Sequence, residues 1–60
     1  MTGADLKQAR EDAELTQEQI ADKLGVSRVT VTLWEGKAEV KKPKADRFLA
    51  AVAELAKAAA

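Results

Sequence analysis

The sequence contains no cysteine and no histidine, and both absences exclude classes of protein. Without cysteine, the chain has neither a disulfide framework nor the ligand set of a zinc finger, so its stability has to come from packing. Without either residue, it lacks the commonest general base, the commonest nucleophile and the softer metal ligands. We therefore expect no enzyme and no metal or other cofactor.

Long apolar runs and a basic leader are also missing. No apolar stretch is long enough to span a bilayer, and the residues after Met1 lack the basic start and apolar core of a signal peptide. Together with the lack of cysteine, these absences predict a protein of the reducing cytoplasm with no membrane contact.

The chain is short and rich in alanine, which limits the folds open to it. A domain of 60 residues buries about 60% of the surface that the unfolded chain exposes, which allows one modest core. Alanine supplies 13 of the 28 hydrophobic residues and favours helix. Strand signals are confined to Val29–Thr32, without turn signals to pair them. We predict a single all-α domain over residues 1–60, with no small-molecule ligand.

The first two expected helices are marked by capping residues. Thr2 precedes an apolar pattern that predicts a first helix through about residue 14. Thr16 and Gln19 have the spacing of a capping box, which predicts a second helix from residue 17. Gly25 suits the left-handed conformation that ends such a helix.

Two more helices are expected after this point. Ser27 is a good N-cap for a third helix over residues 28–35, which Gly36 stops. A loop follows, and Pro43 suits the first position of a last helix over about 44–58.

The short connection between the second and third helices is the most informative feature. Three residues, Gly25–Ser27, set the two helices at a large angle, which predicts a helix-turn-helix over about 17–35. Ala21 permits close approach of the helices, while Val31 and Trp34 bury the unit. In this motif the second helix enters the major groove of DNA with its amino-terminal residues leading.

Several segments together carry a family resemblance: Leu6–Arg10, Leu15–Ala21, Leu24–Ser27, Val31 and Trp34–Gly36. In these residues the chain resembles the Xre/Cro/C1 family of phage and bacterial repressors. The resemblance implies a compact four- to five-helix, lambda-repressor-like DNA-binding domain that often acts as a homodimer on operator half-sites. It also implies a phosphate contact for Gln17 and an ion pair between Arg10 and Glu35. The residues that it places toward the bases are Arg28, Val29, Thr32 and Leu33.

The side chains of this region have chemistry suited to DNA. Arg28 can donate two parallel hydrogen bonds to guanine, a pairing worth about 1–3 kcal/mol of discrimination. Val29 and Leu33 can meet thymine methyl groups, so we expect a half-site with G·C and T features. Hydroxyl and ammonium groups suited to phosphates are those of Ser27, Thr30, Thr32, Lys37, Lys41, Lys42 and Lys44.

Simpler interpretations of these residues stay open. Arg28 can be a solvated charge, the lysines can serve solubility alone, and Gln17 can merely belong to the first turn of its helix. Val29 and Leu33 can instead form an apolar patch that binds another protein.

Two functions from different classes follow. The first is a sequence-specific regulator of transcription that represses, as a phage Cro protein does, by occupying a double-stranded operator. The second is a protein-interaction module, antitoxin-like or adaptor, whose contact surface is Val29, Leu33 and Val40. A module of this size needs a homodimer on two half-sites about 34 Å apart for useful affinity. The candidate dimer surface is Val40, Phe48, Leu49 and the Ala-rich end.

The distribution of charge along the chain agrees with a nucleic-acid partner, although the net charge of the whole chain does not. Ten basic and ten acidic side chains give a net charge of zero. Residues 1–27 carry three basic and six acidic side chains, net −3, whereas residues 28–47 carry six basic and three acidic, net +3. The positive segment contains the expected recognition helix and the loop after it, where DNA would lie.

Overall fold

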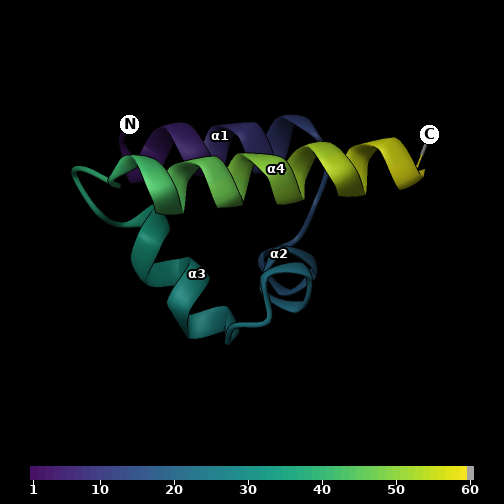
Figure 1. Cartoon of the computed structure of the whole chain (residues 1–60), viewed down its shortest axis with the longest axis horizontal. Helices are drawn as coiled ribbons and strands as arrows, with labels where there is room; N and C mark the ends of the chain where they lie inside the picture. Colours follow the sequence, from purple (N-terminus) through teal and green to yellow (C-terminus); the bar gives the residue numbers. More distant parts are fainter. Residues whose placement is uncertain (60) are drawn as a thin grey trace.

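Four α-helices make up the fold in the computed structural model, which describes residues 1–59 and contains no strand within them (Figure 1). The helices are α1 (Gly3–Asp12), α2 (Gln17–Leu24), α3 (Arg28–Glu35) and α4 (Lys42–Ala59). Helices α1 and α4 run in the same direction, and α2 and α3 lie together below them in Figure 1. The prediction of a small all-α helix-turn-helix fold is confirmed. Ala60, part of the Ala-rich end proposed as a dimer surface, lies outside the described residues.

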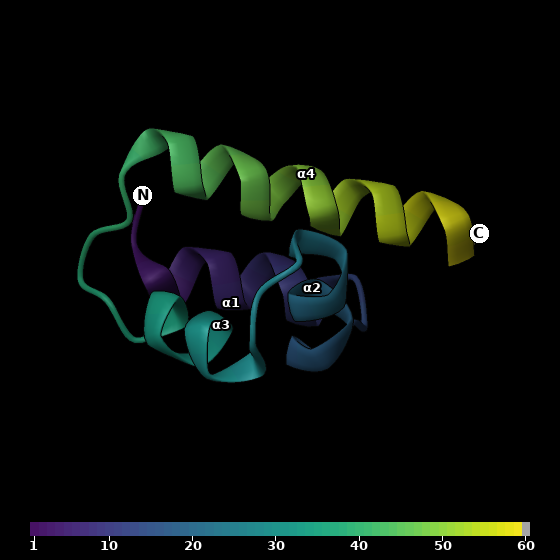
Figure 2. The ribbon, with the colours of Figure 1, turned by 60° about the horizontal axis from the view of Figure 1, so that its bottom comes forward.

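Each helix contributes to one hydrophobic core. Leu6 of α1, Ile20 of α2, Val31 of α3 and Phe48 of α4 are fully buried. Both α3 and α4 pack against α1 and α2, as the two views in Figures 1 and 2 show. The third helix is thus fixed by its inner face, which leaves its outer face to solvent.

The first helix ends two residues earlier than the sequence pattern predicts. The N–H of Leu15 donates to the carbonyl of Arg10 at 3.1 Å, and the N–H of Glu14 donates to that of Glu11 at 2.9 Å. These two bonds form a Schellman motif, which satisfies carbonyls left over at the helix end. The motif requires a left-handed residue, and Glu14 adopts φ 58° although it is not glycine. The helix therefore stops at Asp12, and the chain turns toward α2.

The strain at Glu14 predicts a stabilising substitution. Glu14→Gly is expected to raise the free energy of unfolding by about 1 kcal/mol, because glycine adopts positive φ without a steric cost. Glu14→Ala removes the charge but keeps the Cβ atom, so it is expected to change stability little. The matched change Gly25→Ala, at φ 71° with no atom within 4 Å of an added Cβ, should lower stability by about the same amount. Urea unfolding measures all three; a Glu14→Gly protein less stable than the parent contradicts this view.

The start of the last helix also differs from the prediction, whereas the third helix ends at Glu35 as predicted. Helix α4 begins at Lys42, so Pro43 is its second residue rather than its first. Proline fits there because N–H groups in the first turn have no partner inside the helix. Gly36 ends α3 with φ −88° and ψ −7°, so it does not need the left-handed conformation.

Two residues proposed for the dimer surface are buried. Val40 is 2% exposed and Phe48 is 0% exposed, so neither is available to a second protein. The N–H of Val40 donates to the carbonyl of Met1 at 2.7 Å, which holds the loop against the amino-terminal segment. Val40 is therefore also wrong as part of a protein-interaction surface, and Leu49 is half-buried.

Gly3 allows the first helix to start directly against the end of the third. Its N–H donates to the carbonyl of Lys37 at 2.8 Å. A Cβ atom at this position would lie less than 3.0 Å from backbone atoms of Trp34 and Glu35. The close approach fixes the carboxyl end of α3, and no local sequence signal pointed to it.

Candidate nucleic-acid interface

The turn between α2 and α3 has the geometry that the capping pattern predicts. Thr16 and Gln19 form a reciprocal capping box, with distances of 3.1 and 2.8 Å from backbone N–H to side-chain oxygen. Gly25 is left-handed at φ 71°, and the N–H of the next residue donates to the carbonyl of Ala21 at 3.0 Å. Ser27 then accepts the N–H of Thr30 at 3.3 Å and starts α3. The helix-turn-helix is therefore present over 17–35.

Helix α3 divides into a buried and an exposed half. Val31, Trp34 and Glu35 face inward. The four residues predicted to face DNA bases all lie exposed on the other side: Arg28, Val29, Thr32 and Leu33. Val29 and Leu33 are 64% and 62% exposed, which is high for large apolar side chains. The structure thus brings the predicted base-contacting residues together on one surface, the outer face of α3.

A buried ion pair fixes α3 to the rest of the domain. Arg10 Nε lies 2.8 Å from Glu35 Oε2, and the two side chains are only 11% and 4% exposed. Arg10 also donates through Nη1 to the carbonyl of Leu15 at 2.7 Å. One guanidinium therefore joins α1, the turn before α2 and the end of α3, as the family resemblance implies for Arg10 and Glu35.

Gln17 bridges α2 and α3 instead of standing free. Its Nε2 donates to Glu35 Oε1 at 3.0 Å, and its Oε1 accepts the hydroxyl of Thr32 at 3.2 Å. One of its two N–H groups is therefore used in the hydrogen bond to Glu35. Sequence reasoning missed this bridge because Gln17 lies 15 positions before Thr32 and 18 positions before Glu35. Contacts between residues so far apart leave no local pattern in the sequence.

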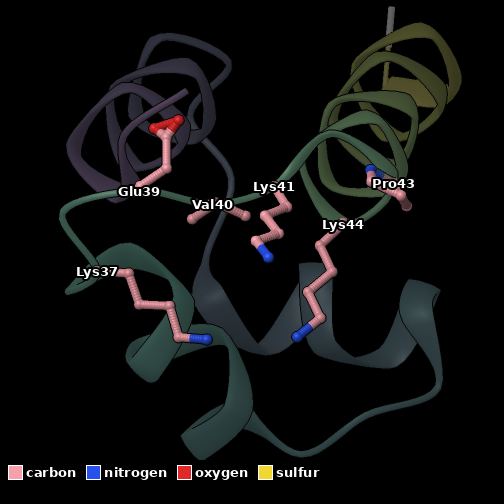
Figure 3. A pocket seen from close by; sticks show the side chains of 6 residues that line it. All are labelled: Lys37, Glu39, Val40, Lys41, Pro43 and Lys44. Carbon is pink, nitrogen blue, oxygen red and sulfur yellow. The ribbon is translucent and has the colours of Figure 1, made fainter.

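Three lysines predicted to contact phosphate surround one hollow between α3 and α4 (Figure 3). Lys37, Lys41 and Lys44 direct their ammonium groups to the same side of it, and Glu39 points away from them. The hollow measures about 400 Å³. Lys44 Nζ also lies 6.0 Å from the ring centroid of Trp34, at the end of α3. Positive charge is therefore gathered next to the carboxyl end of α3.

The other predicted phosphate contacts differ in how available they are. Lys42 is exposed but does not line this hollow. Ser27 is exposed and Thr30 half-buried, and their hydroxyl oxygens lie 3.1 Å apart. Arg28 and Gln17 line a second hollow of about 430 Å³, which places the amino-terminal ends of α2 and α3 beside each other.

The comparisons with known proteins agree with this geometry. A helix-turn-helix family model matches residues 6–58, which is most of the chain. No curated protein and no solved structure matches the chain. Within the described part of the chain, no helix is long and apolar enough to cross a membrane. Because the match covers both helices of the motif and their packing partners, the chain belongs to the helix-turn-helix family of DNA-binding transcription regulators.

Proposed function

We propose that this protein is a sequence-specific, Cro-like repressor of the cytoplasm that places α3 in the major groove of a double-stranded operator. The observation that carries the proposal is the outer face of α3, where Val29 and Leu33 are 64% and 62% exposed beside Arg28. Covering apolar side chains that are exposed to this degree removes their surface from water, which lowers the free energy of the complex. The methyl groups of thymine in the major groove are a partner of matching chemistry.

Each part of the surface has a distinct role in this proposal. Arg28 donates to guanine O6 and N7, and Val29 and Leu33 contact thymine methyl groups. Phosphates on the flank are bound by Lys37, Lys41, Lys42 and Lys44, and those at the start of the motif by Gln17, Ser27 and Thr30. Two copies bind as a homodimer to half-sites about 34 Å apart, and the bound dimer represses by excluding polymerase.

The roles of Arg28 and the lysines predict different effects of substitution. Arg28→Ala is expected to remove about 1–3 kcal/mol of preference for guanine at one position, because the paired hydrogen bonds are lost. Lys41→Ala is expected to weaken all duplexes equally and to reduce the slope of log affinity against log salt by about one. Binding of both variants to matched and mismatched duplexes checks this. Equal weakening of all duplexes by Arg28→Ala contradicts its role as a base-reading residue.

Selection from randomised duplexes tests the proposal as a whole, with the affinity of the selected site measured at several salt concentrations. We expect a preferred site with G·C and T features, and an affinity that falls steeply with salt as condensed ions are released. Selection without any preferred base contradicts the proposal. Binding that ignores salt and requires a protein partner on Val29 and Leu33 supports the interaction-module alternative.

A further inference from the structure

A chain of hydrogen bonds links Arg10 to Thr32 through Glu35 and Gln17. The chemistry of these groups fixes which atom donates and which accepts in each bond. A guanidinium can only donate and a carboxylate can only accept, so Glu35 accepts from Arg10 at 2.8 Å. Glu35 Oε1 must also receive an N–H group from Gln17, at 3.0 Å. The opposite orientation of the amide would place two oxygen atoms against each other. Gln17 therefore turns its amide oxygen toward Thr32.

Thr32 has one hydroxyl proton and two acceptors in the protein. Its Oγ1 lies 3.2 Å from Gln17 Oε1 and 3.1 Å from the carbonyl oxygen of Arg28. Neither of these oxygens can donate, so the proton of Thr32 is held on the protein side. Thr32 is nevertheless exposed on the outer face of α3. Its hydroxyl oxygen consequently has only lone pairs to offer to a partner outside the protein.

We infer that Thr32 contacts a base only as a hydrogen-bond acceptor and therefore selects a base with an exocyclic amino group. This inference rests on the proposed placement of α3 in the major groove. In that groove, cytosine presents the N4 amino group and adenine the N6 amino group. Guanine O6 and thymine O4 are acceptors, so they would face the lone pairs of Thr32 without a proton between them. The bridge made by Gln17 thus strengthens a base preference that the Arg28 carbonyl also supports, although Gln17 reads no base.

The test is selection from randomised duplexes by the parent protein and by three variants. Thr32→Val keeps the branched shape without the hydroxyl, Thr32→Ser keeps the hydroxyl, and Gln17→Met removes the bridge without shortening the side chain much. For Thr32→Val, we expect one position of the half-site to lose its preference for cytosine or adenine. Affinity for the parent's best site should fall about tenfold, with the other positions unchanged. Thr32→Ser should retain the preference.

Gln17→Met provides a second readout. It removes one of the two acceptors of the Thr32 proton, while the Arg28 carbonyl at 3.1 Å remains, so discrimination against guanine and thymine at the same position is expected to weaken but not to vanish. A general loss of affinity with this discrimination unchanged is the result of losing a phosphate contact alone and contradicts a share of Gln17 in the base preference. Thermal unfolding of each variant confirms that it is folded before selection.

The remaining outcomes separate the inference from the proposed function. If the parent selects a site that Thr32→Val reads unchanged at every position, the inference is wrong and the proposed function stands. The same holds if the position that changes carries guanine or thymine in the parent's site, because Thr32 then donates. If the parent selects no duplex, the proposed function fails and the inference fails with it.

Discussion

Replacing Glu35 with alanine is expected to lower the free energy of unfolding by about 3–5 kcal/mol, because it leaves a buried guanidinium without its partner. Counted over the whole residue, Arg10 and Glu35 are 9% and 8% exposed, so water can replace little of the lost interaction. The substitution also removes the acceptor of Gln17 Nε2, which lies 3.0 Å from Glu35 Oε1. Denaturant unfolding followed by circular dichroism measures the loss.

Two further variants test whether the loss comes from the unpaired charge. Glu54→Ala breaks the exposed ion pair with Lys23 and is expected to cost less than about 1 kcal/mol. Replacing both Arg10 and Glu35 with methionine is expected to recover most of the lost stability, because an apolar pair needs no partner. A Glu35→Ala protein as stable as its parent contradicts this role of the pair.

Gly3→Ala is the second substitution with a large expected effect, a loss of about 3 kcal/mol. The added Cβ would lie less than 3.0 Å from the carbonyl oxygens of Trp34 and Glu35. These are backbone atoms, so no side chain can rotate away, and α1 has to move off the end of α3. The shift also weakens the hydrogen bond from the Gly3 N–H to Lys37, now 2.8 Å long. Thermal or denaturant unfolding measures the effect.

Gly36→Ala is the matched control for Gly3→Ala. The nearest atom to an added Cβ at Gly36 is the Thr32 carbonyl oxygen at 3.6 Å, an ordinary contact. Its φ of −88° is open to any residue, so the change is expected to be neutral or to stabilise by about 0.5 kcal/mol. If both glycine variants prove equally stable, close packing of α1 on α3 is not what requires Gly3.

The parts of the fold that the sequence predicts are those set by neighbouring residues. The limits of α2 and α3 follow from local rules, because the residues that cap them form hydrogen bonds with partners no more than four positions away. These capping residues are Thr16, Gly25 and Ser27. The end of α1 does not, because Glu14 takes a left-handed conformation that its type does not indicate. Pro43 is accepted at either of two positions in a first turn, so it fixes the start of α4 only within two residues.

The features that sequence reasoning missed depend on contacts between distant residues. Gly3 meets the end of α3, and Val40 is buried by the way its loop folds back. Gln17 lies between Glu35 and Thr32, which gives it a bridging role that capping rules do not contain. By contrast, the family resemblance implies which residues of α3 face outward, and Arg28, Val29, Thr32 and Leu33 are indeed all exposed.

The central claim is that the outer face of α3 contacts DNA, and methyl NMR during titration with the selected duplex tests it most directly. The methyl groups of Val29 and Leu33 are exposed on that face, whereas those of Val31 and Val40 are buried and serve as internal controls. We predict that the signals of Val29 and Leu33 shift in proportion to bound duplex, while those of Val31 and Val40 change little. Unchanged Val29 and Leu33 signals in a saturated complex, with shifts instead at Leu55 of α4, would contradict the claim.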